Sequence, residues 1–390
     1  MDAAAHPAVA GRLRPERAAR GPGLSATPQS GHAALVDLLH GRGLLDETWR
    51  AVWHAVPREP FIPARAWRQE PDGCVPLTGE ADRLALVHAD EPVIVQVDDG
   101  KPDGPSVATS SNSQPSMVAR MLGLLDVADG HRVLEIGTAT GYVAALLSRR
   151  LGERNVHSVE IDPAMAAWAR EALRAAGYAP HLAHGDGEQG WPGAAAPFDR
   201  LLVTCAVRHV PYPLVRQLRP GGVLVTPLAR DFWSGAVVRL AVGEDGTARG
   251  RFHGGASYMP MRAHRKAEGA PVEEATARPT AVCVDPAQLL DLGFALYAGA
   301  RLPGVSMLHA EEPDGGVRVW LRAPDGSAAT AASREDAWLY GPRDLWGEVE
   351  TVYGEYVRLG SPAADAFGLV VGAEEEWIWV GDPSRRVGPA

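Results

Sequence analysis

Apolar residues between positions 130 and 230 follow two alternating patterns. Short clusters rich in Val, Leu and Ile have the composition of buried strands, and the segments between them have apolar residues at helical spacing. Strands and helices that alternate in this way predict an α/β fold, a parallel sheet with helices on both faces. The predicted strands are Arg132–Ile136, Val156–Glu160, Phe198–Thr204 and Gly222–Pro227, and the predicted helices are Tyr142–Leu151, Pro163–Ala176 and Pro211–Leu218.

The flanking regions have different patterns. Residues 31–70 have leucines and tryptophans at helical spacing until the prolines of Val56-Pro57-Arg58-Glu59-Pro60 start an extended segment. Val237–Val242 and Ala248–Phe252 are typical of a hairpin that closes the sheet, and a stretch rich in Pro, Glu and Ala follows. We therefore divide the chain into a disordered tail (residues 1–30), a main α/β domain with an N-terminal helical and extended segment (31–265), a linker (266–280) and a small α+β accessory domain (281–390).

Charge and composition exclude several classes of partner. The formal net charge of −10 argues against nucleic acid, because phosphate contacts need a basic face. No apolar run is long enough to span a membrane, and the first thirty residues have no secretory apolar core. The three cysteines are far apart, without the spacing of a metal site. We therefore expect a cytoplasmic protein with neither a nucleic-acid nor a membrane partner and without a metal site.

The first predicted strand ends in a carboxylate and a turn of small residues. The run from Val133 to Tyr142 reads VLEIGTATGY, with Gly137 and Gly141 where the backbone must turn sharply near a nucleotide. Such a turn alone fits a dinucleotide or another adenosine-containing cofactor. Ala139 stands where a dinucleotide site needs its second glycine, and Glu135 would repel a pyrophosphate. The turn therefore favours a cationic cofactor such as S-adenosylmethionine over NAD.

Two more carboxylates follow later strands. Glu160 ends the second strand about twenty residues past the turn, where a carboxylate can bind ribose hydroxyls. Asp186, in Gly185-Asp186-Gly187 after a short third strand, is placed to accept from an adenine amino group. Each carboxylate alone also fits a solvated strand end, but three at the carboxyl ends of strands favour an adenosyl cofactor.

The chain resembles the protein-L-isoaspartate O-methyltransferases from about residue 35 to about residue 262. The glycine turn is shared with methyltransferases in general, whereas Gly185-Asp186-Gly187 with Gly190-Trp191-Pro192, and Ser113-Gln114-Pro115, are far more specific to this family. The other matching elements follow in the family's order. Beyond the turn, the full set is Val56-Pro57-Arg58-Glu59, Ser113-Gln114-Pro115, His184-Gly185-Asp186-Gly187, Gly190-Trp191-Pro192, Phe198-Asp199-Arg200, Val203-Thr204-Cys205-Ala206 and Leu218-Arg219-Pro220-Gly221-Gly222.

This resemblance implies a Rossmann-like class I fold and methyl transfer from S-adenosylmethionine, which leaves S-adenosylhomocysteine, to a peptide carboxylate. Ser113 matches the family's active-site serine and is expected to orient the carboxylate, although it also suits a helix cap beside Pro115. The residues expected at the cofactor are Glu135, Gly137, Thr138, Ala139, Gly141, Tyr142, Glu160, Ile161, Gly185, Asp186, Gly187 and Thr204, and those expected at the substrate are Ser111, Asn112, Ala206, Arg208 and His209.

The chain departs from the family pattern in three places. Ala139 replaces a glycine of the turn, and the usual Gly-Gln-Thr before the serine is missing. Thr109-Ser110-Ser111-Asn112 follows the insertion-like Asp98–Pro105 instead. Arg208-His209 occupies a usually small and apolar stretch, where a cation would either pair with an acidic peptide or belong to a solvated loop.

These departures and the accessory domain resemble the longer actinobacterial family members associated with ribosomally synthesised modified peptides of the lanthipeptide, lasso peptide or graspetide type. That subtype implies methylation of an Asp side chain in a cyclised or otherwise modified precursor peptide. The ester would then close to aspartimide, which can open to isoaspartate. Two alternatives stay open: a repair methyltransferase for L-isoaspartyl proteins, and a catalytically silent module that only binds peptide.

Overall fold

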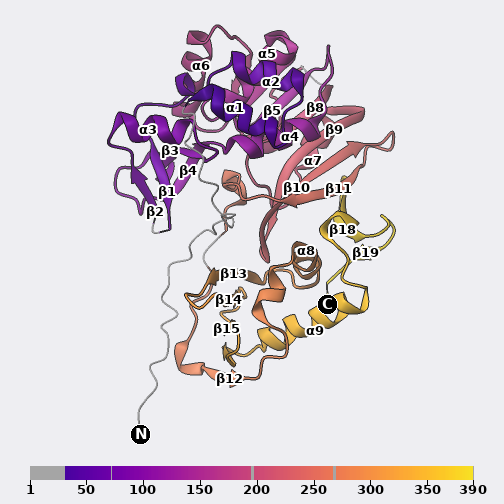
Figure 1. Cartoon of the computed structure of the whole chain (residues 1–390). Coiled ribbons are helices and arrows are strands. Elements are labelled where there is room, and N and C mark those ends of the chain that lie inside the picture. The colour runs from indigo at the N-terminus through magenta and orange to yellow at the C-terminus, as the bar shows by residue number, and fades with distance from the viewer. Residues whose placement is uncertain (1–30, 72, 195–196, 267–268, 390) are drawn as a thin grey trace.

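The computed structural model describes residues 31–71, 73–194, 197–266 and 269–389 (Figure 1). The tail predicted for residues 1–30 lies outside the described residues. None of the helices in the described ranges is long and apolar enough to cross a membrane.

A ten-stranded sheet runs through the molecule in the order β19-β18-β17-β11-β10-β9-β8-β5-β6-β7. The strands from β9 to β7 in this order pair in parallel, and the remaining pairs are antiparallel. The predicted α/β class is thus confirmed, including the closing hairpin of β10 and β11. The strands are β5 (Val133–Ile136), β6 (Val156–Glu160), β7 (His181–His184), β8 (Phe198–Val203), β9 (Leu218–Arg230), β10 (Trp233–Val242), β11 (Ala248–Gly255), β17 (Phe367–Val371), β18 (Glu376–Val380) and β19 (Arg386–Val387).

Two apolar cores lie against the large sheet, because alternate residues of a strand point to opposite faces. On β5, Val133 packs in one core, whereas Leu134 and Ile136 pack in the other. The core around Val133 is covered by helices from the first half of the chain (Figure 1). They are α1 (His32–Gly41), α2 (Glu47–Ala55), α4 (Pro115–Leu125), α5 (Tyr142–Leu151) and α6 (Pro163–Ala175).

The other core continues from the large sheet into the C-terminal region. Phe232 and Trp233, at the start of β10, share this core with Phe294 of α8, and the rings of Phe232 and Phe294 are 5.9 Å apart. The predicted boundary at 266–280 is therefore crossed by a continuous core, and β17 to β19 return to the large sheet. This core involves α7 (Tyr212–Arg216), α8 (Leu292–Arg301), α9 (Leu345–Arg358) and a five-stranded sheet of β12 (Arg278–Thr280), β16 (Ala337–Tyr340), β15 (Ala328–Ala332), β14 (Val317–Arg322) and β13 (Ser306–Glu311).

A small antiparallel sheet precedes the main fold and ends next to Ser113. Its strand order is β2-β1-β3-β4, and the last of these strands leads directly into the segment before α4. The elements are β1 (Trp67–Glu70), β2 (Gly73–Pro76), α3 (Glu80–Val87), β3 (Val93–Val97) and β4 (Ala108–Asn112).

One buried arginine joins this small sheet to the rest of the molecule. Arg58 has no exposed surface, and burial lowers the pKa of its guanidinium to about 10. Its Nε donates to Asn112 Oδ1 at 2.7 Å, and Asn112 Nδ2 donates to Thr140 Oγ1 at 2.8 Å in the glycine turn. The remaining guanidinium bonds, between 2.9 and 3.3 Å long, go to the carbonyl oxygens of Val87, Ala89, Glu91, Asn112 and Ser113.

We predict that Arg58→Met destabilises the protein by about 3 kcal/mol or more, because it leaves these buried acceptors without donors. The free energy of unfolding from urea denaturation measures the effect. Arg170→Met is the matched control, since Arg170 is exposed on α6, and we expect a change within about 0.5 kcal/mol. Similar losses in both variants would contradict the role assigned to Arg58.

Candidate cofactor and substrate site

The turn after β5 has the backbone that its small residues permit. Gly137 and Gly141 have positive φ angles of 98° and 85°, and Ala139 adopts φ 47°. A Cβ on Gly137 would lie 2.7 Å from Thr204 Oγ1, which donates to the carbonyl oxygen of Gly137 at 2.7 Å. The left-handed conformation costs a residue with a Cβ roughly 1–2 kcal/mol, so Ala139 stores strain that glycine would avoid.

Glu160, at the end of β6, faces this turn. Its Oε2 accepts from the Ala139 N–H at 2.7 Å, and its Oε1 accepts from the Asp162 N–H at 2.9 Å. Burial is the main cause of a raised pKa at Glu160, which these backbone hydrogen bonds partly offset. Each carboxylate oxygen has a further lone pair, so Glu160 can still accept hydrogen bonds from ligand hydroxyls.

Glu135 is fully buried beneath the turn. Ser158 Oγ donates to Glu135 Oε2 at 2.7 Å and lies 2.6 Å from Thr138 Oγ1. Glu135 Oε1 has no hydrogen-bond partner. Burial raises the pKa of Glu135 to about 8, and the nearby charge of Glu160 adds to the shift. An unpaired buried carboxylate oxygen is costly, and a cationic ligand group would compensate for it.

The segment after β7 also reaches the turn. Gly187 is buried so close to β5 that an added Cβ would lie 2.4 Å from Ile136 Cγ2. Asp186 is exposed and accepts from the Glu188 N–H at 3.0 Å. The structure thus brings Gly185–Gly187 to the end of β5, as the predicted site requires.

One residue predicted at the cofactor, Tyr142, directs its side chain away from the turn. The side chain of Tyr142 is buried in the core, where its hydroxyl donates to the Val56 carbonyl and its ring is 5.8 Å from that of Trp53. Only its main chain can therefore contact a cofactor in the turn. Ile161 follows Glu160, and its carbonyl oxygen is 3.2 Å from His184 Nε2.

Ser113 does not cap the helix that follows it. The N-cap of α4 is Gln114, whose side chain makes no capping bond, and Asp90 accepts from the N–H of Ser116 at 2.8 Å. The Ser113 side chain instead lies near the Tyr258 phenol and acts on its pKa, which burial raises. This polar pair lies at the end of β4, and Tyr258 is the functional candidate that sequence reasoning missed.

The predicted substrate side chains are partly committed within the protein. Asn112 uses its amide between Arg58 and Thr140 and so does not face a peptide. Arg208 Nη2 donates to Asp231 at 2.7 Å, so its charge is paired within the protein, and Lys266 Nζ lies 2.7 Å from the same carboxylate. Ser111 is half-buried on β4, Ala206 is buried, and His209 is exposed.

The segment of residues 256–266 fastens the site together. Its backbone pairs with Ala206, since Met261 donates to the Ala206 carbonyl at 2.8 Å. Arg262 pairs with Asp162 at 3.2 Å and with Asp99 at 3.1 Å, and Arg265 donates to Asp99 at 2.6 Å. Because Asp99 belongs to the insertion after β3, the insertion is tied to this segment.

A group of Glu188, His209 and His264 has ligand atoms within 4.8 Å of one another, as a metal site would. However, His264 Nδ1 accepts from the Arg208 N–H at 2.8 Å, so the proton of a neutral ring lies on Nε2. That Nε2–H is 2.6 Å from Glu188 Oε1. His264 therefore offers no free lone pair to a metal ion, and the group is a hydrogen-bonded pair with His209 stacked on it at 4.5 Å.

Comparisons of the sequence with known proteins indicate one family. The family model described as protein-L-isoaspartate(D-aspartate) O-methyltransferase matches residues 85–266. The chain is 38% identical over 179 residues to a protein-L-isoaspartate O-methyltransferase of Thermococcus onnurineus, covering 45% of this chain and 74% of that protein. It is 33% identical over 226 residues to the protein-L-isoaspartate O-methyltransferase 2 of a Polaromonas species, covering 58% of this chain and 92% of that protein.

The fold is also similar to that of a solved protein-L-isoaspartate O-methyltransferase. The TM-score is 0.54 at 19% sequence identity, and the likeness covers 90% of this chain and 100% of the other. A match of that extent includes much of the region beyond residue 266, where the family match ends. The C-terminal region thus takes part in a known architecture.

We predict that Glu135→Gln makes the ligand-free protein more stable at pH 8.5. A pKa raised in the folded state means that ionisation opposes folding increasingly as the pH rises from 4.5 to about 8. Gln is neutral and of similar shape, so the variant gains at least about 1 kcal/mol at pH 8.5 and little at pH 5. Thermal unfolding at the two pH values measures this, and an equal gain at both would contradict the assignment.

Proposed function

The chain belongs to the protein-L-isoaspartate O-methyltransferase family, and we propose that it methylates the free carboxylate of L-isoaspartyl residues in proteins and peptides. Like the family, it is an S-adenosylmethionine-dependent carboxyl O-methyltransferase. The proposal concerns the acceptor. In isoaspartate the main chain runs through the β-carboxyl carbon and leaves the α-carboxylate free, whereas ordinary aspartate presents its β-carboxylate.

The observation that carries this proposal is the placement of Ser113. Its hydroxyl is not used as a helix cap and interacts with Tyr258, while its carbonyl oxygen is held by Arg58 at 3.1 Å. The same guanidinium is connected through Asn112 to Thr140 in the turn. A hydroxyl that can bind an acceptor oxygen is thus fixed relative to the turn that would hold the methyl donor.

The residues around the turn fit S-adenosylmethionine. The unpaired Oε1 of Glu135 is a buried acceptor that suits a positively charged group. Glu160 and the exposed Asp186 offer acceptors for the ribose hydroxyls and the adenine amino group. When bound, this cofactor would supply a methyl group attached to a sulfonium sulfur, and the neutral thioether that remains is a good leaving group.

Methyl transfer to a carboxylate needs little acid or base catalysis from the protein. A carboxylate is ionised at neutral pH, so no general base is needed. When S-adenosylmethionine is bound, it would supply the methyl group to one oxygen of a carboxylate held near Ser113, and the electron pair of the carbon–sulfur bond would stay on sulfur. Ser113 and Tyr258 orient the acceptor oxygen, and orientation is the main contribution available to the enzyme. The backbone nitrogen of the next residue can then displace methanol from the ester to form a succinimide.

A second candidate function is methylation of an Asp side chain in a constrained precursor peptide. The feature that favours it is the insertion before β4, which Asp99 ties to Arg262 and Arg265 beside the site. The paired state of Arg208 weakens one argument for a special acidic substrate. The relatives matched over most of their length are named for isoaspartate, so we rank isoaspartyl repair first. A silent module ranks last, because Ala139 keeps the left-handed turn despite its methyl group.

We predict that the enzyme methylates a linear isoaspartyl peptide at least about 100-fold more efficiently than the same peptide with aspartate. Transfer of a labelled methyl group to the two peptides, and to a cyclised aspartate peptide, measures this preference. Faster methylation of the cyclised peptide would overturn the ranking in favour of peptide tailoring. Absence of methylation on all three, together with absence of cofactor binding by calorimetry, would favour the silent module.

We also predict that Ser113→Ala lowers kcat/KM for the isoaspartyl peptide about 10- to 100-fold, because the acceptor oxygen loses a positioned donor. Tyr258→Phe should lower it less, since Ser113 remains. Calorimetry should give S-adenosylmethionine affinities within about twofold of the unsubstituted enzyme. Ser110→Ala is the control, because Ser110 is half-buried on β4, and it should leave the kinetics unchanged. A loss of cofactor affinity in Ser113→Ala would show that the serine acts on the cofactor instead.

A further inference from the structure

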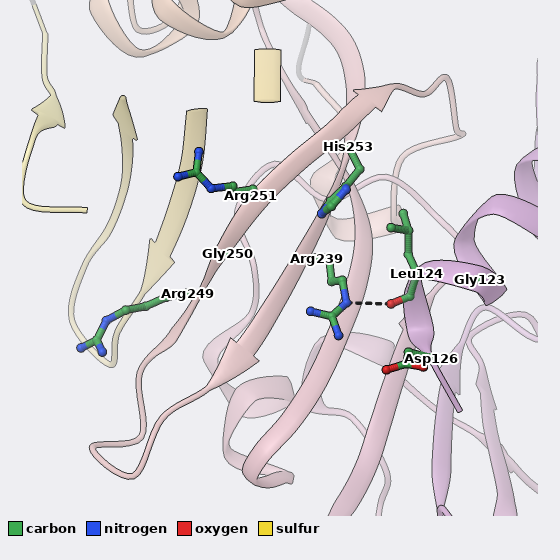
Figure 2. Close-up of a pocket in the computed structure, with 8 residues that line it drawn as sticks. All are labelled: Gly123, Leu124, Asp126, Arg239, Arg249, Gly250, Arg251 and His253. Atoms are coloured by element: carbon green, nitrogen blue, oxygen red, sulfur yellow. Dashed lines mark hydrogen bonds between the residues drawn. The ribbon is translucent and has the colours of Figure 1, made fainter. Parts of the chain in front are cut away.

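A hollow with a volume of about 520 Å³ lies on the outer side of β10 and β11, at the end of α4 (Figure 2). We propose that this hollow is a docking site for an acidic peptide segment, whose carboxylates bind Arg239, Arg251 and His253. It is lined by Gly123, Leu124, Asp126, Arg239, Arg249, Gly250, Arg251 and His253.

The strand β11 concentrates positive charge on one face. Its sequence alternates, so that Ala248 and Phe252 are buried while Arg249, Arg251 and His253 are exposed. This is a basic surface on a chain whose formal net charge is −10, so it opposes the overall composition.

Two arginines occupy paired positions on the two strands. Arg239 of β10 is the register partner of Arg251 of β11, and their side chains extend in opposite directions, toward α4 and toward Trp379 (Figure 2). The pKa of His253 is lowered, first by burial and then by the positive charges of Arg239 and Arg120. The lowered pKa favours the neutral form of His253, which can still offer a hydrogen bond. The positive charge of the hollow comes from its arginines, which outnumber Asp126, the one carboxylate in its lining.

The guanidiniums of Arg239 and Arg251 are each held in place without being neutralised. Arg239 Nε donates to the Leu124 carbonyl oxygen at 2.8 Å, and Arg251 Nη1 donates to the Asp365 carbonyl oxygen at 2.8 Å. Arg251 also lies 4.8 Å above the ring of Trp379. Neither arginine has a carboxylate partner among the described residues, whereas Arg249 is already paired with Asp245. Guanidiniums fixed by neutral acceptors keep their charge and lose little entropy when they bind carboxylates.

The hollow is separate from the methyl-transfer site. Ser113 precedes the first turn of α4, whereas Gly123, Leu124 and Asp126 lie at its other end. The 11 residues of the helix put these ends about 16 Å apart. A segment of substrate that binds here would thus be remote from the carboxylate that is methylated.

Peptide carboxylates fit the hollow better than other anions do. An inorganic anion would occupy a small part of its volume, and nucleic acid needs a longer basic track than this acidic chain offers. Asp126 is the one carboxylate among the lining residues, and it repels anions from the end of α4. Carboxylates are therefore expected on the side of Arg239 and Arg251. The proposed docking site rests on the proposed function in one respect: protein substrates would supply the acidic segments.

The test uses a fluorescent glutamate-rich peptide that contains neither aspartate nor isoaspartate, with binding measured by fluorescence anisotropy at low ionic strength. Arg239→Gln and Arg251→Gln should each weaken binding about fivefold or more, because each removes a charge-assisted contact. Arg170→Gln makes the same charge change at an exposed site on α6 and should have no effect.

Asp126→Asn provides a gain-of-binding variant. Asp126 has a left-handed backbone, φ 52°, which Asn tolerates equally well, so the fold should be kept. Removal of its charge should tighten binding about two- to fivefold. This variant tests the proposal even if an arginine variant is unstable in thermal unfolding.

Three results would overturn the proposal: no peptide binding, equal binding by all variants, or displacement of the peptide by equimolar inorganic phosphate. Tighter binding of a single-stranded oligonucleotide than of the peptide would also overturn it, in favour of nucleic acid. Methylation of an uncharged isoaspartyl peptide should be unchanged in Arg239→Gln. If that methylation is absent from the unsubstituted enzyme, the proposed function fails, while the anisotropy result still decides the docking site.

Discussion

The guanidinium of Arg58 joins the segment that contains Ser113 to the glycine turn after β5. Removal of an arginine from water is expensive, and here the cost is offset by carbonyl oxygens from several segments and by the amide of Asn112. The planar fork of arginine can reach these acceptors together, which a lysine ammonium cannot do. Because Asn112 also binds Thr140, the small N-terminal sheet and the glycine turn are held in one arrangement.

Buried carboxylates and backbone strain lie together at the glycine turn, and a cationic ligand would offset the cost of the buried carboxylates. The charge of Glu160 adds to the raised pKa of the buried Glu135, and one oxygen of Glu135 has no hydrogen-bond partner. Ala139 adds backbone strain at φ 47°. In the proposed site, the strain and the unpaired oxygen are present before a ligand binds. Electrostatic groups that are already in position stabilise a ligand more effectively, because the protein does not have to reorganise.

The sequence predicted the parts of the fold that local patterns determine. The strands β5, β6 and β8 and the helices α5 and α6 agree with the predictions within a residue or so at each end, because their apolar spacing matches one regular structure. β9 is longer than predicted, from Leu218 to Arg230, because pairing with β10 extends it beyond the apolar run. Glycine and carboxylate positions in the turn could be read from the sequence for the same local reason.

Partners that are distant in the sequence could not be predicted. The pairing of Arg208 with Asp231 depends on how the segment after β8 meets the turn after β9, and hydropathy does not encode that contact. Tyr258 reaches Ser113 from a position 145 residues later in the chain, as the two residue numbers show. Long-range side-chain pairs of this kind follow from packing, which a single sequence does not reveal.

The junction between β11 and β17 explains why the C-terminal region is part of the main fold rather than an appendage. At this junction a Cβ on Gly368 would lie 2.3 Å from the Gly250 carbonyl oxygen and 2.1 Å from the Trp379 ring. A Cβ on Gly250 would in turn lie 1.7 Å from the Arg239 carbonyl oxygen. Glycines therefore let the strands approach closely, and β17 covers the edge that β11 would otherwise expose. Since the same contact brings Trp379 under Arg251, the C-terminal region also shapes the basic hollow at the end of α4.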